Sequence, residues 1–272
     1  MPPDTHIAAA PTAQAVTATL NYLVPTAEKP QRFLYDRPGM ANWTGVEDKR
    51  DVPIADARGH EGDFTLETSG FALLRAPSVE HAFTDEAAIT SAYYDECAAI
   101  VAHATGAARV IVFDHTLRGP DMPRDPVLRV HNDYTEKSAP QRICDLLPGE
   151  ADALIDKRYA FINVWRPIAH PVVDVPLAFC DARSFTDDDL IMTDLVYEDR
   201  LGEIASVRYR PEHRWYFFSR MTPDEVALIK CFDSARDGRA RGSFHSAFVD
   251  PTAPAGGPAR QSIEIRTIAF FG

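Results

Sequence analysis

The sequence lacks any run of apolar residues long enough to span a membrane. Its first residues, MPPDTHIAAAPTAQAV, also lack the basic start and apolar stretch of an export signal. Positive charge is scarce, since 28 Lys and Arg against 40 Asp and Glu give a formal net charge of −12. A phosphate backbone or an anionic membrane would repel such a chain. We therefore expect a cytoplasmic protein with a small-molecule substrate, no nucleic-acid partner and no membrane partner, and the sequence leaves homo-oligomer formation open.

Cysteine is scarce and scattered. The four cysteines, Cys97, Cys144, Cys180 and Cys231, form no C-x-x-C pair, which excludes a zinc ribbon and a thioredoxin-like site. Without an export signal, we expect reduced and mostly buried thiols rather than disulfides. The chain also has no internal repeat, no glycine-rich phosphate loop and no alternation of strands with helices, so a doubly wound nucleotide-binding fold is not expected.

The chain does contain many short strand patterns separated by Pro, Gly and Asp. We expect strands within residues 18–25, 70–77, 108–118, 127–134, 159–168, 176–185, 204–210, 214–220, 242–248 and 260–271. This spacing is typical of a sandwich or jelly roll. Residues 1–17, rich in Ala, Pro and Thr, are expected to be a mobile N-terminal tail, and residues 18–272 a single domain of the α+β class, mainly β with flanking helices.

Two segments show helix signals. Residues 84–106, TDEAAITSAYYDECAAIVAHATG, have apolar residues at helical spacing, acids in the first turn and a glycine at the end. Residues 222–234, TPDEVALIKCFDS, begin with Thr222, Pro223 and Glu225 in the positions of a capping box. We expect a helix in each.

His131 and Asp133 form an H-x-D pair in VLRVHNDY, at the end of a predicted strand. Residues i and i+2 of a strand point to the same face, so the imidazole and the carboxylate project together. A hydrogen-bonded pair without chemistry is one interpretation. The other is two of the three ligands of a mononuclear iron site, which binds metal through two imidazoles and one carboxylate and leaves positions open.

The third ligand of such a site would be a later histidine, and three follow the pair. His170 precedes a proline and is expected in a turn, and His213 follows Pro-Glu among charged residues. His245, in GSFHSAF, lies inside a predicted strand between small and aromatic residues. We therefore prefer His245.

Arginines near the C-terminus suit an acidic cosubstrate. A 2-oxo acid that chelates iron leaves a distal carboxylate, which a guanidinium binds bidentately, often beside a hydroxyl. Arg260 and Ser262 share one face of the last predicted strand, and Arg266 falls on the same side by the period of two. These three residues predict a 2-oxoglutarate site, with Arg260 placed first as the anchor.

The segment NVWRPI offers further candidates. Asn163 and Arg166 are candidates to point toward the cosubstrate or substrate, and Trp165 is expected to pack in the core on the other face. An arginine before a proline at a strand end is, however, more often part of a surface or structural ion pair.

The sequence resembles the iron(II)- and 2-oxoglutarate-dependent oxygenase family of the cephamycin 7α-methoxylase component and the gibberellin desaturase. The likeness covers residues 18–271 and is carried by NYLVP, DARGHE, GFALLRAPS, VIVFDHTLR, VHNDYT, NVWRPI, LAFCDARS, WYFFSRMTPDEVALIKCFDS and HSAFVDPTAPAGGPARQSIEIRTIAFF. The resemblance implies a double-stranded β-helix that binds Fe(II) through His131, Asp133 and His245 and uses 2-oxoglutarate and O2. It implies oxidation of an unactivated C–H of a secondary-metabolite or amino-acid-derived substrate by hydroxylation, desaturation or ring closure.

Two alternatives stay open from the sequence. An iron-dependent oxidase that does not use 2-oxoglutarate would keep the three metal ligands but not need Arg260. A non-catalytic jelly-roll protein would use the pocket only to bind a small molecule, and the three ligand residues would then meet by chance.

Overall fold

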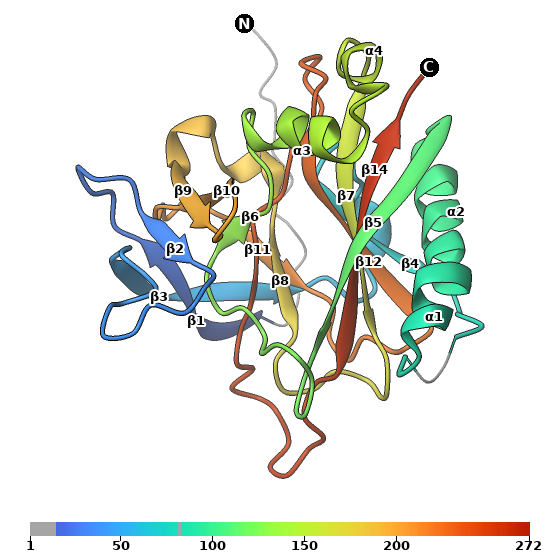
Figure 1. The fold of residues 1–272 in the computed structure, drawn as a ribbon. Helices are drawn as coiled ribbons and strands as arrows, with labels where there is room; N and C mark the ends of the chain where they lie inside the picture. The colour runs from blue at the N-terminus through green and yellow to red at the C-terminus, as the bar shows by residue number, and fades with distance from the viewer. Residues whose placement is uncertain (1–14, 81–82) are drawn as a thin grey trace, which may run out of the picture.

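Two β-sheets make up most of the protein (Figure 1), as seen in a computed structural model that describes residues 15–80 and 83–272. The strand order of the larger sheet is β1 (Ala15–Leu23), β3 (Glu47–Asp56), β11 (Trp215–Phe217), β8 (Leu177–Cys180), β13 (His245–Ala247), β6 (His131–Asn132), β10 (Leu201–Val207), β9 (Leu190–Val196) and β2 (Gln31–Phe33). The order of the smaller sheet is β4 (Phe71–Arg75), β12 (Glu225–Asp233), β7 (Tyr159–Pro167), β14 (Ser262–Phe270) and β5 (Arg109–Arg118).

The main apolar core lies between the two sheets. Phe161 and Ile229 of the smaller sheet join Phe179 and Ala247 of the larger one in a single buried cluster. Each of these strands is buried on its inner face because removing apolar surface from water is the main favourable term in folding. The core also contains Cys231, one of four free cysteines of which three are buried.

The elements outside the sheets are η1 (Glu61–Asp63), α1 (Glu86–Ala88), η2 (Ile89–Tyr93), α2 (Tyr94–Thr105), α3 (Ser138–Leu146), α4 (Ala151–Ile155), η3 (Ala182–Ser184) and η4 (Asp187–Asp189). The continuous helical segment from α1 to α2 covers the outer face of the smaller sheet, whereas α3 and α4 pack against the core between the sheets. Cys97 and Val101 of α2 pack on Ile162 and Val164 of β7, and Figure 1 shows α2 along this face. The predicted helix over 84–106 is confirmed as α1, η2 and α2 in succession, ending at Gly106 with φ +70°. Across the described residues, no helix is long and apolar enough to cross a membrane.

The larger sheet curls so that its first strand returns toward its middle. Val130, just before β6, donates a backbone hydrogen bond of 2.9 Å to the carbonyl of Asn21 in β1, although several strands separate β1 from β6 in the sheet order. The curled sheet facing a smaller sheet is a double-stranded β-helix, or jelly roll. The predicted fold class, mainly β with flanking helices, is confirmed.

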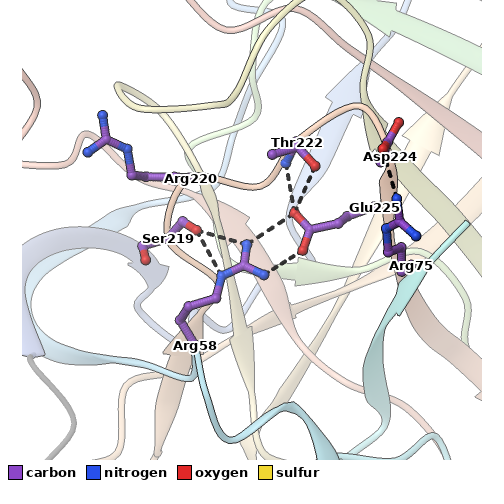
Figure 2. A pocket seen from close by; sticks show the side chains of 7 residues that line it. All are labelled: Arg58, Arg75, Ser219, Arg220, Thr222, Asp224 and Glu225. Carbon is purple, nitrogen blue, oxygen red and sulfur yellow. Dashed lines mark hydrogen bonds and ion pairs between the residues drawn. The ribbon is translucent and has the colours of Figure 1, made fainter. Parts of the chain in front are cut away.

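The predicted helix over residues 222–234 is wrong, because this segment forms strand β12. The interactions expected of a capping box are present, since the Glu225 carboxylate accepts from the Thr222 amide at 2.8 Å and lies 3.2 Å from its hydroxyl (Figure 2). They close a turn before the strand instead. From Val226 to Asp233 every residue is buried, because β12 lies between β4 and β7 with both faces covered. An apolar run of this length is compatible with a helix or with a central strand, and tertiary burial decides between them.

Most of the predicted N-terminal tail, residues 1–14 of 1–17, lies outside the described residues. Its last three residues, Ala15, Val16 and Thr17, already belong to β1, where they pair with β3. The strand therefore begins earlier than the alternation in the sequence predicts.

Candidate metal centre

His131 and His245 become direct neighbours in the larger sheet. β13 pairs antiparallel with β6, and the register places His245 opposite His131. Side chains directly opposite each other on paired strands point to the same face. The two imidazole rings are consequently 4.5 Å apart between centroids, although more than a hundred residues separate them in the chain.

Asp133 completes a three-residue group. One candidate ligand atom from each of His131, Asp133 and His245 lies within 4.8 Å of the other two. The His131 Nε2 is 3.5 Å from Asp133 Oδ1. The second carboxylate oxygen, Oδ2, accepts a hydrogen bond of 2.8 Å from Asn163 Nδ2 and lies 3.4 Å from Arg266 Nε. The carboxylate is thus held by residues of the smaller sheet, so the group lies between the two sheets.

The charges around this group suit a cation. Burial alone would raise the pKa of Asp133, but the hydrogen bond from His131 and the charge of Arg266 hold that pKa well below its ordinary range. Burial and the neighbouring His131 lower the pKa of His245 to about 4. The carboxylate is therefore ionised and the His245 imidazole neutral near pH 7, which are the forms that bind a metal.

The inward faces of β5, β14 and β7 supply the other polar residues of the site. Along β14, Ser262, Glu264 and Arg266 alternate with the apolar residues that pack toward α2. Opposite them in register lie Arg118 and Thr116 of β5, and Asn163 and Trp165 of β7. These residues face the two histidines across the interior.

Arg266 is surrounded by carboxylates. Its guanidinium lies 2.6 Å from Glu264 Oε1, 3.1 Å from Asp114 Oδ2 and 3.4 Å from Asp133 Oδ2, and it donates to the Thr116 hydroxyl at 2.9 Å. Burial alone would lower the pKa of Arg266, but these carboxylates raise it. Its charge is already compensated within the protein.

Arg260 is in the opposite situation. It is 2% exposed, and its side chain donates to the Ser262 hydroxyl and to the Val175 carbonyl, both at 3.0 Å. Its guanidinium carbon lies 4.9 Å from the centre of the Trp165 ring. Among the described residues it forms no ion pair with a carboxylate, and burial together with the charge of Arg118 lowers its pKa to about 9.

The structure does not bring Arg166 to this group. Its guanidinium donates to Glu96 at 3.0 Å, to the Tyr93 hydroxyl at 2.9 Å and to the Pro223 carbonyl, on the helix-covered face of the smaller sheet. Asn163 and Arg166 are three residues apart and so lie on opposite faces of β7. Trp165 is buried in the core, as expected, but it shares the inward face with Asn163, so the expectation that it packs on the other face is wrong.

A small cavity of about 20 Å³ adjoins the two histidines. The residues that line it are Arg118, Val127, His131, Leu177, His245, Ala247, Arg260 and Glu264. Sequence reasoning missed Arg118 and Glu264. Glu264 lies midway between Ser262 and Arg266, so the period of two already assigned it to their face, whereas Arg118 reaches this face only through the pairing of β5 with β14.

Comparisons with known proteins agree with this geometry. A family model described as an oxidoreductase/YMDC permease-like domain matches residues 20–270. The hydroxylase/desaturase efuI of Hormonema carpetanum is 33% identical over 94% of this chain and 95% of its own length. The Fe(II)/2-oxoglutarate-dependent dioxygenase nvfI of Aspergillus novofumigatus is 33% identical over 85% of each chain.

The fold matches a solved structure equally well. The structure of the iron and alpha-ketoglutarate-dependent endoperoxidase NvfI superposes with a TM-score of 0.87 at 28% identity, covering 95% of this chain and 98% of that one. The match extends over both sheets and is accompanied by sequence identity along most of the chain. The chain therefore belongs to the family of iron(II)- and 2-oxoglutarate-dependent oxygenases that contains these fungal hydroxylase/desaturases.

Proposed function

We propose that His131, Asp133 and His245 hold the Fe(II) of this oxygenase. The observation that carries the proposal is the convergence of three ligand atoms within 4.8 Å, two from imidazoles and one from a carboxylate. This donor set fits a ferrous site that keeps positions open for other ligands. The neutral His245 imidazole and the ionised Asp133 carboxylate need no proton loss before they bind metal.

Arg260 and Ser262 are the residues that we assign to the distal carboxylate of 2-oxoglutarate. A guanidinium that is buried without a carboxylate is costly in a protein interior. Arg260 lines the cavity next to both histidines, and its contacts with Ser262 and Trp165 fix the plane of the guanidinium. An incoming carboxylate would meet a preoriented fork of donors beside a hydroxyl.

Arg266 and Asn163 take a different part in the proposal. Both contact Oδ2 of Asp133, and this leaves Oδ1, the oxygen nearer to His131, for the metal. Groups that hold a ligating carboxylate in this way tune the affinity of the site for metal. We therefore assign Arg266 to the orientation of Asp133 and not to 2-oxoglutarate.

When bound, Fe(II) and 2-oxoglutarate supply the oxidation of a substrate C–H by O2, coupled to decarboxylation of the 2-oxo acid to succinate. The chain's own residues supply position: the sheets fix the two histidines by strand pairing, and the apolar core around Phe161 and Phe179 limits access of water. We propose a secondary-metabolite or amino-acid-derived substrate that is hydroxylated, desaturated or cyclised. We also propose that residues 18–272 act as one domain in the cytoplasm, and that the family includes the cephamycin 7α-methoxylase component and the gibberellin desaturase that the sequence resembles.

An anaerobic titration tests the proposed site. Protein with Fe(II) should develop a weak visible charge-transfer band when 2-oxoglutarate is added. His245→Ala removes one imidazole, so we expect the band to disappear, whereas His103→Ala, at an exposed histidine of α2, should keep it. A band of full intensity in His245→Ala would refute the assignment. An iron oxidase without a 2-oxo acid would instead show turnover with no succinate formed.

A further inference from the structure

The cavity beside the metal centre is lined by two guanidiniums, of which the proposed function uses one. Arg260 is assigned to 2-oxoglutarate. Arg118, the last residue of β5, lies opposite Ser262 in the register of β5 with β14, so both side chains point to the inward face. Arg118 and Arg260 both line the cavity, together with His131 and His245.

The guanidinium of Arg118 is held by one backbone carbonyl. Its Nη1 donates to the Asp125 carbonyl at 2.8 Å, and within the described part of the chain it forms no ion pair. Burial lowers its pKa; among its charged neighbours, Glu264 and Asp133 raise that pKa, and Arg266 and Arg124 lower it. Two like charges in a partly desolvated cavity favour an added anion, and Glu264, the one carboxylate among the residues that line this cavity, is already hydrogen-bonded to Arg266 at 2.6 Å.

A surface pocket of about 340 Å³ elsewhere in the protein shows the contrast (Figure 2). There Arg58 donates to both oxygens of Glu225, at 2.5 and 3.2 Å, and to the Ser219 carbonyl. That guanidinium is neutralised by the protein and needs no ligand. Arg118, in contrast, donates to one backbone carbonyl and to no carboxylate among the described residues.

The two cavity arginines differ in how deeply they are buried. Arg260 is fully buried, whereas Arg118 is partly buried and bonded to the 119–130 loop, in which Asp121, Arg124 and Asp125 are exposed. Arg118 is therefore the more exposed of the two guanidiniums. Of the two carboxylates of 2-oxoglutarate, one is assigned to Arg260 and the other belongs at the metal, so neither requires Arg118.

We propose that Arg118 binds a carboxylate of the substrate, and that the enzyme therefore selects small organic acids. This inference rests on the proposed function of the site. It makes Arg118 a residue that determines specificity: its guanidinium would fix the acid end of the substrate near the loop and direct the rest of the molecule toward the histidines.

The test compares an acid with its methyl ester. Protein loaded anaerobically with Fe(II) and saturating 2-oxoglutarate is titrated with benzoate and with methyl benzoate by calorimetry. We expect benzoate to bind at least about tenfold more tightly, because a charged hydrogen-bonded pair is worth about that much. Arg118→Gln should abolish the preference and Arg118→Lys should retain part of it. Arg124→Gln, which removes the same charge from the exposed loop, should leave the preference intact.

Two outcomes would overturn the proposal. The first is any result that separates the acid preference from Arg118. Such results are that the unmodified protein binds neither probe or binds both equally, or that Arg118→Gln keeps the preference for benzoate. The other is a loss of 2-oxoglutarate affinity of about tenfold in Arg118→Gln, which would assign Arg118 to the cosubstrate. Absence of the 2-oxoglutarate band in the unmodified protein would refute the proposed function itself. Arg118→Gln should melt close to the unmodified protein without ligands, because it removes one hydrogen bond to a loop carbonyl and no ion pair.

Discussion

The three guanidiniums near the candidate metal centre differ in the number of carboxylates that they contact. Arg266 contacts three of them, and Arg260 and Arg118 form ion pairs with none among the described residues. The protein thus compensates the charge of Arg266 with its own carboxylates, and we assign the other two arginines to ligands. Arg260 and Arg266 lie on the same face of β14, and only the tertiary neighbours distinguish their roles.

This difference predicts opposite effects for two similar variants. Arg260→Gln should raise the KM for 2-oxoglutarate by about tenfold or more, because it removes a charged bidentate contact. Its affinity for Fe(II) should stay within about twofold. Arg266→Gln should weaken Fe(II) binding by about 10- to 100-fold, as expected when a carboxylate ligand loses its support. Anaerobic Fe(II) titration and initial rates of succinate formation measure the two quantities.

Thermal melting of both variants provides the control for folding, and Arg266→Lys should restore part of the Fe(II) affinity. If Arg266→Gln raised the KM for 2-oxoglutarate and left Fe(II) binding unchanged, the two assignments would have to be exchanged.

The neighbours Trp165 and Arg166 show what single-residue reasoning on the sequence can reach. The period of two predicts that Asn163 and Trp165 share a face and that Arg166 lies on the other, and applying it strictly would have excluded Arg166 from the site. What the sequence could not show is the partner of each residue, because Glu96 and Arg260 come from distant segments.

At the scale of elements, the site depends on close contacts between strands and loops. Gly70, just before β4, has φ +81°, and a Cβ there would lie 2.8 Å from the Gly242 carbonyl oxygen. Gly242 is in the segment that leads into β13 and His245. A side chain at residue 70 would therefore push on the backbone beside the metal centre.

Two glycine variants separate these effects. Gly106 follows α2 with φ +70°, and a Cβ added there would have no atom within 4 Å. Gly106→Ala should therefore lower the free energy of unfolding by about 1 kcal/mol through backbone conformation alone. Gly70→Ala adds a clash with a backbone oxygen and should cost clearly more. Chemical denaturation measures both free energies of unfolding. Equal costs would show that the segment around Gly242 moves freely.

Element types could be predicted where the pattern is periodic. The helix over 84–106 has a one-sided apolar pattern and is confirmed. The segment 222–234 has buried residues on every side, so periodicity does not distinguish a strand from a helix, and the capping-box residues favoured the wrong choice. Its position between β4 and β7 becomes evident only from the assembled sheet.

At the scale of the whole molecule, a buried ion network links the ends of β7 and β12. Asp233 is fully buried and contacts Arg158 at 2.7 Å and Lys230 at 3.0 Å. Burial alone would raise the pKa of Asp233, but these two cations lower it below the ordinary value. The carboxylate is thus ionised throughout the neutral range.

The network predicts how stability depends on pH. A lowered carboxyl pKa contributes stability that is complete above the unfolded value of about 4 and is lost as pH falls through the folded value. Asp233→Asn should therefore destabilise the protein at pH 7 by about 3 kcal/mol and flatten the loss of stability below pH 4. Denaturant unfolding between pH 7 and pH 3 measures this, with the exposed Asp199→Asn as control. An unchanged acid slope in Asp233→Asn would contradict the assignment.

The overall architecture could be predicted from the sequence, whereas the pairing of its strands could not. Short strands at regular spacing and the family resemblance together indicated a jelly roll, because burial of alternate residues is a local pattern. The order of strands in the sheets is set by packing between distant segments. The juxtaposition of His131 with His245 was expected from the chemistry of a metal site, and the β6–β13 register is the physical means by which the fold produces it.

The most direct test is a crystal structure of the protein prepared anaerobically with Fe(II) and 2-oxoglutarate, with data collected at the iron absorption edge. We predict one anomalous peak bonded to His131, Asp133 and His245, with the distal carboxylate of 2-oxoglutarate on Arg260 and Ser262. Iron bound elsewhere, or no iron between the two histidines in protein that retains both sheets, would contradict the account.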